Sequence, residues 1–305
     1  MEHDQQHTSS ETDTPNSTDN TKQGNTIIAC LDGASLSQAV CDYGIWLAKT
    51  FNRPLCLVHV NEPGASDTSD LSGAIGLGAA SDLLTELASL EKDRAKLIRK
   101  QGQLMLEAAK QRALDQGVAA VEIEQRLGYL SEYLIAKEQT TAFVVVGIRG
   151  AAHEQQNAGV GAQVEQLIRS VRRPILVVTG AFDAPKRCLF AYDGSPPCER
   201  ALEMVSQYDA FAQFSWTVVH AVEDQNVTAD FKRAQQRLSQ AGFTQVDYHA
   251  THGRPSDALV GCQEQYATDL MVMGAFSHHP LRGFFFGSLT GTVLQSTCKP
   301  LLLLH

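Results

Sequence analysis

The residues best suited to binding a ligand stand just after short apolar runs in the second half of the chain. Asp193 and Gly274 each end such a run, and Gly287 and Ser288 stand directly before an apolar pattern of helical period. Glycines let a main chain approach a phosphate closely, and the free N–H groups at a helix start attract an anion. Ser288 adds a hydroxyl donor at that point. This combination predicts a site for a phosphorylated ligand.

The first half of the chain repeats this arrangement. In each half an apolar run ends in Asp-Gly, and a histidine, His59 or His220, closes the next apolar run 27 residues after the Asp. Spacings that agree along the whole chain indicate an internal repeat. The matched segments are 26–32 and 187–193, 55–60 and 216–222, 117–128 and 242–253, 143–147 and 270–274, and 173–178 and 299–304.

Five apolar segments in each copy alternate with helix-compatible stretches, the pattern of β and α units around a parallel sheet. Strands covered by helices on both faces read as continuous apolar runs, as these do. We predict an α/β fold of two tandem Rossmann-like domains, each an open, mainly five-stranded parallel sheet with helices on both faces. The expected organisation is a disordered polar tail over 1–24, a first domain over 25–180 and a second over 186–305.

An insertion distinguishes the first copy. Asp32 and Gly128 are 96 residues apart, whereas the matching Asp193 and Gly253 are 60 apart, which places about 36 extra residues at about 61–96. The insertion begins with a Gly-, Ser- and Asp-rich loop. Apolar residues at helical spacing then predict one long amphipathic helix or two. We expect their stripe to face the core in preference to forming a zipper; it includes Leu83, Leu90, Leu97 and Leu104.

Composition excludes several classes of protein. A formal net charge of −9 without a long Lys/Arg run argues against nucleic acid as a partner. The sequence offers neither an apolar run long enough for a bilayer nor a signal-peptide pattern, so we expect no membrane partner and a cytoplasmic location. The seven cysteines form no CxxC pair, which favours reduced core thiols and no metal site.

On these residues the chain resembles a tandem member of the universal stress protein family, over about residues 26–305. ATP-binding members of that family carry Gly, two residues, Gly, nine residues, Gly, then Ser or Thr. Gly274, Ser277, Gly287 and Ser288 keep this spacing, with serine in place of the second glycine. The resemblance implies a bound ATP, or AMP or ADP, with or without Mg²⁺.

The resemblance also implies roles for individual residues in the second copy. Asp193 and the main chain of Ala221 would meet the adenine end of the nucleotide. Gly274 and the residues after it would surround the ribose and phosphates. The complete set of expected nucleotide-binding residues is Asp193, Ala221, Met273, Gly274, Ser277, Gly287, Ser288 and Thr290.

The first copy keeps less of this pattern. Gly147 and Gly150 match the first two glycines, but ten residues separate Gly150 from Gly161, and Ala162 replaces the hydroxyl residue. A missing donor and an altered loop length both weaken a phosphate site. We therefore expect a weaker first site, formed by Asp32, Val60, Gly147, Gly150 and Gly161.

Three functions follow as hypotheses. The leading one is a non-catalytic stress-response sensor or regulator whose state depends on a bound adenine nucleotide, and we assign no catalytic residue. A slow ATPase is the first alternative, although the chain has no GxxxxGK[ST] loop. The second is a scaffold or apolar-ligand binder whose first site has degenerated.

The repeat also predicts how the copies associate. We expect them to pair face to face within one chain as an intramolecular pseudo-dimer. The last apolar segments, Ile175–Val178 and Leu301–Leu304, are the expected contact, since an apolar edge strand invites pairing. Assembly into a homo-oligomer stays open. His59 and His220 are expected to pack with a satisfied ring nitrogen.

Overall fold

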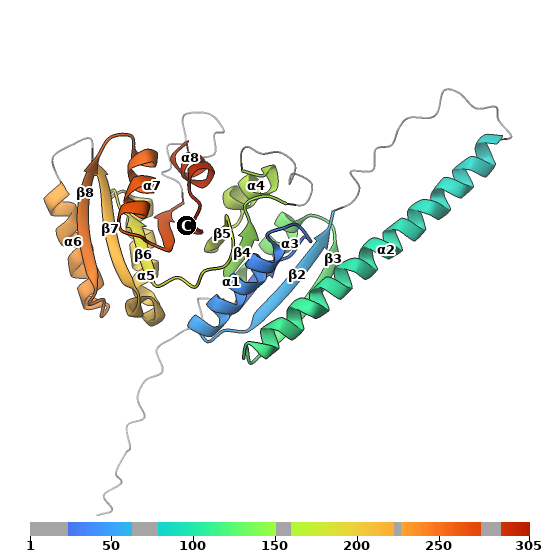
Figure 1. Cartoon of the computed structure of the whole chain (residues 1–305), viewed down its shortest axis with the longest axis horizontal. Helices are drawn as coiled ribbons and strands as arrows, with labels where there is room; N and C mark the ends of the chain where they lie inside the picture. The colour runs from blue at the N-terminus through green and yellow to red at the C-terminus, as the bar shows by residue number, and fades with distance from the viewer. Residues whose placement is uncertain (1–23, 63–78, 151–159, 223–226, 276–287) are drawn as a thin grey trace, which may run out of the picture.

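The computed structural model describes residues 24–62, 79–150, 160–222, 227–275 and 288–305. Within these residues, strands from both halves form one ten-stranded sheet in the order β3-β2-β1-β4-β5-β10-β9-β6-β7-β8 (Figure 1). The strands are β1 (Thr26–Cys30), β2 (Leu55–Asn61), β3 (Val121–Leu127), β4 (Thr141–Gly147), β5 (Ile175–Val178), β6 (Arg187–Ala191), β7 (Ser215–Val222), β8 (Val246–His252), β9 (Leu270–Gly274) and β10 (Leu301–Leu304).

Helices cover both faces of this sheet. They are α1 (Ser37–Thr50), α2 (Ala79–Asp115), α3 (Leu130–Ala136), α4 (Ala162–Ser170), α5 (Pro196–Gln207), α6 (Val227–Gln240), α7 (Pro255–Gln265) and α8 (Ser288–Ser296). One hydrophobic cluster includes side chains of α1, α2, α5 and α6, and a second includes side chains of α3, α4, α7 and α8. The central strands are buried between the two clusters, which explains their unbroken apolar runs.

Each half is a parallel, doubly wound sheet. In the first half β1 pairs in parallel with β2 and β4, and in the second β6 pairs in parallel with β7 and β9. The predicted fold class, two tandem Rossmann-like α/β domains, is confirmed. Strand order reverses between β1 and β4, and again between β6 and β9. Open sheets of this kind bind ligands at the carboxyl ends of the strands beside such a reversal.

The two halves join along their edges. β5 and β10 pair antiparallel, with Leu302 opposite Leu176. The predicted contact between the last strands is confirmed, but the halves meet edge to edge rather than face to face. The reason is that an outer strand carries unpaired N–H and C=O groups, and pairing two such strands satisfies both sets while helices keep the faces covered. The joined sheet is consistent with an intramolecular pseudo-dimer.

Aromatic side chains extend the joint beyond the main-chain hydrogen bonds. The ring centroid of Phe51 lies 5.2 Å from that of Tyr208 and 4.9 Å from that of Phe211, so aromatic rings of the first and second halves are in contact. Phe143 lies 5.3 Å from Tyr208 as well. Aromatic pairs at these separations add stability beyond the area they bury. The two halves therefore share one hydrophobic core.

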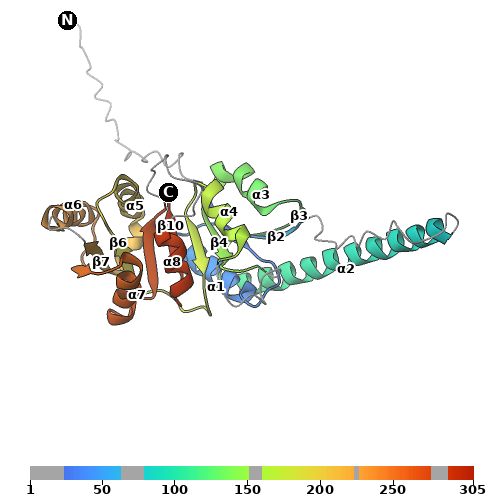
Figure 2. The ribbon, with the colours of Figure 1, turned by 90° about the horizontal axis from the view of Figure 1, so that it is seen from above.

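One helix, α2, of 37 residues begins within the insertion predicted at about 61–96 and continues to Asp115. Its C-terminal part packs on the sheet through the buried Leu106 and Ala113, while its N-terminal part extends past β3, away from the second half (Figures 1 and 2). The prediction that the leucine stripe faces the core is wrong, because Leu83, Leu90, Leu97 and Leu104 are 37%, 60%, 67% and 56% exposed. At 1.5 Å per residue a helix of this length outruns the sheet, so only its last turns reach the core.

Two expected segments lie outside the described residues, namely almost all of the polar tail over 1–24 and the glycine-rich loop before α2. All seven cysteines are free, and six of them are buried, as expected for core thiols. Among the described helices, none is long and apolar enough to cross a membrane.

Candidate functional site

The turn after β1 holds a carboxylate at the carboxyl end of the first half-sheet. Oδ1 of Asp32 accepts hydrogen bonds from the Ala34 N–H at 2.9 Å and from the Ser37 hydroxyl at 2.8 Å. The Ser37 oxygen in turn accepts the Gly33 N–H at 2.9 Å. Gly33 has a φ of +80°, which a side chain would disfavour. The Asp-Gly pair thus forms a tight turn that fixes Asp32 beside the strand-order reversal.

Four of the five residues expected at the first site come together around this turn. Asp32, Val60 and Gly150 line both a small cavity of about 40 Å³ and a larger one of about 570 Å³, and Gly147 lines the smaller. A Cβ on Gly150 would lie 3.3 Å from Oδ2 of Asp32, so glycine permits this close approach. Gly161 lines neither cavity. It precedes α4, and its N–H donates to the Ile148 carbonyl at 3.0 Å.

Helix α2 forms a wall of the larger cavity that the sequence did not predict. Ile98, Gln101, Gly102 and Met105 all line it. A Cβ on Gly102 would lie 2.5 Å from Cδ2 of His59 on β2, closer than real contacts allow. Glycine at this position therefore lets the helix lie against the strand. A glycine within a strong helical pattern was the available signal for this close approach.

Polar contacts complete the rim of the first site. His59 has both ring nitrogens paired, Nδ1 with the Leu31 carbonyl at 2.7 Å and Nε2 with Oδ1 of Asn61 at 2.9 Å. The expected satisfied histidine is confirmed here. Nε2 of Gln163 donates to Oε1 of Glu62 at 2.7 Å, which links the end of β2 to the start of α4. Neither Glu62 nor Gln163 was expected from the sequence, because they are far apart along the chain.

The described lining of the first site is acidic. Asp32 and Glu62 contribute carboxylates, and the larger cavity has no lysine or arginine among its described lining residues. Like charges placed close together repel, and the repulsion is stronger where water is partly excluded. A phosphate placed against these two carboxylates would therefore be repelled.

In the second half, the expected residues gather at the corresponding end of the sheet. Oδ1 of Asp193 accepts the Ser195 N–H at 2.9 Å, directly after β6. Gly274 ends the neighbouring strand β9, where a Cβ would lie 3.0 Å from the Pro197 carbonyl oxygen. Met273 precedes Gly274 and is buried, and Ala221 is on β7.

The remaining expected residues of the second site are only partly described. Helix α8 begins at Ser288 and holds Thr290, which is 4% exposed. Ser277 and Gly287 lie outside the described residues, so their placement stays a prediction.

A charged network beside the second site was not expected from the sequence. Arg233 on α6 pairs with Asp230 and lies 3.6 Å from Glu199. Nε2 of His220 lies 3.3 Å from Oδ2 of Asp230. A Cβ on Gly194 would come within 3.1 Å of Nη2 of Arg233, so this guanidinium borders the Asp193 turn. The Asp193 turn therefore borders an ion-paired network in which the guanidinium of Arg233 is matched by the carboxylates of Asp230 and Glu199.

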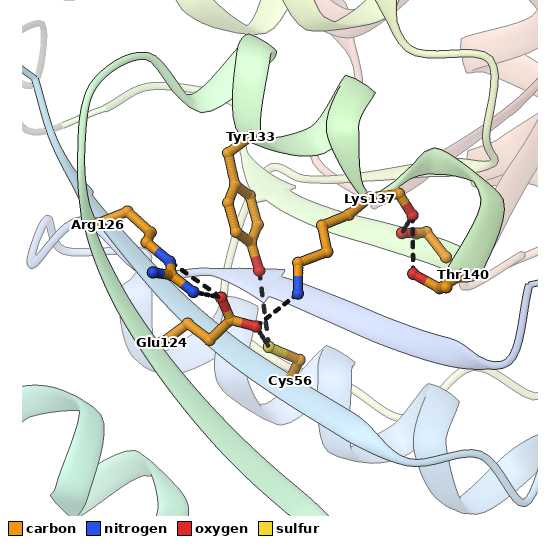
Figure 3. Close-up of polar contacts among 7 residues, drawn as sticks. Cys56, Glu124, Arg126, Tyr133, Lys137 and Thr140 are labelled. Atoms are coloured by element: carbon orange, nitrogen blue, oxygen red, sulfur yellow. Dashed lines mark hydrogen bonds and ion pairs between the residues drawn. The ribbon is translucent and has the colours of Figure 1, made fainter.

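A second polar cluster lies on β2, β3 and α3 (Figure 3). Sγ of Cys56 is 3.9 Å from both Oε1 of Glu124 and the Tyr133 hydroxyl. Glu124 forms ion pairs with Lys137 at 2.9 Å and Arg126 at 2.8 Å. Burial, followed by the charge of Glu124, raises the pKa of the Cys56 thiol to about 11. The thiol stays protonated at neutral pH, so this cluster is a structural contact rather than a nucleophilic site.

The Glu124 cluster predicts a pH dependence of stability. Burial raises the pKa of Glu124, but hydrogen bonds from Lys137 and Arg126 outweigh burial and leave the pKa below its usual range. A carboxylate with a lowered folded-state pKa stabilises the fold above its unfolded pKa, about 4.3, and that stabilisation is lost as pH falls through the folded pKa. We expect Glu124→Gln to lose less stability than the wild type between neutral and acidic pH.

Urea unfolding of both proteins at pH 7 and at a series of lower values measures this difference. Glu122→Gln, a neighbouring carboxyl on the same strand without these ion pairs among its described contacts, is the matched control. Parallel stability curves for the wild type and Glu124→Gln would contradict the assignment of an ion-paired Glu124.

Together the fold and the site define a class. Two doubly wound α/β halves share one sheet, and each half places an Asp-Gly turn and a glycine strand end beside a strand-order reversal. This is the arrangement of a tandem Rossmann-like protein with ligand sites at the carboxyl ends of its strands.

Comparison with known proteins identifies the family. The model of the universal stress protein family matches residues 24–179 and again 185–305, so the chain belongs to that family and carries two of its domains in tandem. It is similar to a universal stress protein of Synechocystis, with 31% identity over 282 residues, covering 90% of this chain and 98% of the relative. A universal stress protein of Bacillus subtilis matches at 29% identity, covering 50% of this chain and 98% of that protein.

A solved structure agrees on the fold. A universal stress protein of Archaeoglobus fulgidus superposes with a TM-score of 0.69 at 19% identity, covering 92% of this chain and 98% of that one. At this identity the likeness concerns the fold alone.

Proposed function

We propose that this protein is an adenine-nucleotide-dependent regulator of the stress response and that its second domain holds the nucleotide. The observation that carries the proposal is the difference between the two strand-end sites. Gly274 and Gly287 keep the phosphate-loop spacing of ATP-binding family members, and Ser288 begins a helix. The free N–H groups at a helix start attract an anion, so the start of α8 is suited to the phosphates.

In this proposal each part of the nucleotide has its own contacts. Asp193 and the main chain of Ala221 hold the adenine end. Gly274 and Ser277 lie along the ribose and phosphates, and the start of α8 faces the phosphates, with or without Mg²⁺. Thr290, in the first turn of α8, belongs to the same proposed set of nucleotide-binding residues. A cytoplasmic location, where ATP is abundant, belongs to the same proposal.

The protein acts as a sensor rather than a catalyst in this proposal. Hydrolysis would need a base or a metal-held water near the γ-phosphate. The carboxylate at the strand end, Asp193, is assigned to the adenine end of the ligand. Among the described residues, no group of three or more His, Cys, Asp or Glu side chains could hold a metal ion.

Mass spectrometry of the material released when purified protein is denatured tests the proposal directly. We expect ATP, ADP or AMP at close to one molecule per chain, and calorimetric titration of emptied protein should give one tight ATP site. Incubation with ATP should release no ADP beyond a protein-free control. A chain that binds no adenine nucleotide would contradict the proposal, and sustained ADP release would favour the slow ATPase.

A second candidate function concerns the first domain. The cavity of about 570 Å³ beside Asp32 is lined by Ile98 and Met105 of α2 as well as by polar side chains. Apolar walls with a few polar groups suit a small ligand. The acidic lining favours a neutral or cationic ligand over a phosphorylated one. Mass spectrometry of the released material tests this too, since such a ligand would be present besides the nucleotide.

A further inference from the structure

Helix α2 carries a stripe of exposed leucines at heptad spacing. Leu83, Leu90, Leu97 and Leu104 recur every seven residues and so follow one face of the helix. Their exposed fractions are 37%, 60%, 67% and 56%, and Leu87, also 37% exposed, lies one turn from Leu83 and Leu90. An exposed apolar stripe of this length on a projecting helix indicates an interaction surface.

The projecting part of α2 has little support from the rest of the chain. Its contacts with the sheet begin near Arg99, whose carbonyl accepts a hydrogen bond from Nε2 of Gln125 at 3.0 Å, and the helix before that point projects from the globular part (Figure 2). Every residue from Thr85 to Ile98 is exposed. Most helical stability in proteins comes from burying an apolar face, and this segment buries little of its own. This part of α2 is thus suited to a partner that covers the leucines.

The charge pattern of the same segment specifies the partner. Residues 82–93 hold four acidic side chains and one basic one, and residues 94–100 hold four basic side chains and no acidic one. The acidic residues are Asp82, Glu86, Glu91 and Asp93, and the basic residues of the second stretch are Arg94, Lys96, Arg99 and Lys100. Two such helices side by side in parallel would place like charges together, whereas an antiparallel pair would place each acidic stretch against a basic one.

We propose that two copies of this chain associate through α2 as an antiparallel helix pair, with the acidic half of each helix against the basic half of the other. A two-fold axis near residues 93 and 94 brings Leu90 of one copy against Leu97 of the other and Leu83 against Leu104. It also puts the two globular parts at opposite ends of the pair. Arg94 and Gln101 interrupt the companion heptad positions. Polar residues at such positions favour one register over others at some cost in stability. This association does not depend on a bound nucleotide.

Sedimentation equilibrium and light scattering on the full chain test the association. We expect a dimer for the wild type and at least a 100-fold higher dissociation constant for the Leu90→Glu, Leu97→Glu double variant. Leu127→Glu, at the 75%-exposed leucine that ends β3, is the matched control and should remain dimeric. Thermal unfolding of the globular part should not change in either variant. A monomeric wild type, or a dimer that survives the double variant, would overturn the proposal.

Disulfide trapping tests the antiparallel orientation. In a Cys298→Ser background, which removes the exposed native thiol, mixed Leu83→Cys and Leu104→Cys chains should form a disulfide-linked heterodimer on mild oxidation. Neither variant alone should cross-link to itself. Self-cross-linking of Leu83→Cys would show a parallel pair and overturn the orientation. If the wild type stayed monomeric and bound anionic phosphatidylglycerol vesicles through these leucines, the partner of α2 would be a membrane surface and not a second copy of the chain.

Discussion

Gly287→Asp is expected to raise the dissociation constant for ATP by about 100- to 1,000-fold, while the matched change in the first domain, Gly161→Asp, leaves total ATP binding almost unchanged. In the proposed site Gly287 lies against the phosphates, where a new side chain would remove space and a new carboxylate would repel them. Two like charges about 4 Å apart near a protein surface repel by about 4 kcal/mol, and each 1.4 kcal/mol corresponds to tenfold in affinity. Calorimetric titration of both variants measures the difference.

The control variant should keep its fold. Gly161 has φ −63° and ψ 139° and directly precedes α4, and aspartate is well suited to that backbone and to that position. A Cβ there would lie no closer than 3.4 Å to its neighbours, an ordinary contact distance. Circular dichroism checks that both variants are folded. If Gly161→Asp abolished binding and Gly287→Asp preserved it, the two sites would have to be exchanged.

The sheet could be predicted from the sequence because parallel strands buried on both faces leave a strong local signal. Continuous apolar runs such as Phe143–Gly147 and Leu270–Gly274 lie within β4 and β9, and the internal repeat matched each strand of the first copy to one of the second. The pairing of β5 with β10 was also predictable, since each is a short apolar strand at the end of its copy.

The position of α2 could not be predicted in the same way. Leucines at helical spacing identify an amphipathic helix, but periodicity does not say what covers its apolar face. The sequence favoured the core because that is where most such stripes lie. In the structure Leu90 and Leu97 are exposed, since the sheet ends before they can reach it.

The candidate sites were predictable only where a residue follows a strand. Asp32 and Asp193 are local features of Asp-Gly turns and were expected. The Glu62–Gln163 hydrogen bond joins residues 101 positions apart, and Arg233 reaches Gly194 from a helix that lies beyond the next strand. Such contacts depend on tertiary packing and leave no local pattern in the sequence.

Arg112→Met is expected to destabilise the protein by about 3 kcal/mol, more than Asp42→Asn does, because the two partners differ in burial. Nε and Nη2 of Arg112 donate to Oδ1 and Oδ2 of Asp42 at 2.6 and 2.9 Å, joining α2 to α1. The Asp42 side chain is 7% exposed and that of Arg112 43%. Losing the arginine leaves a buried carboxylate whose remaining described partner is Gln116 at 3.4 Å. Losing the carboxylate instead leaves an arginine cation that can rotate into the solvent, so Asp42→Asn should destabilise the protein by only about 1–2 kcal/mol.

Urea unfolding at neutral pH compares the two variants with Arg169→Met. Arg169 forms a surface ion pair with Glu165 at 3.9 Å, in which both side chains are well exposed, and its loss should cost less than about 0.5 kcal/mol. Since Arg112 holds the packed end of α2, its loss should also loosen the wall of the first-domain cavity, which increased amide hydrogen exchange around Gln101–Met105 would report. Equal costs for Arg112→Met and Asp42→Asn, with no change in exchange, would mean that the apolar contacts of Leu106 and Ala113 hold the helix without this ion pair.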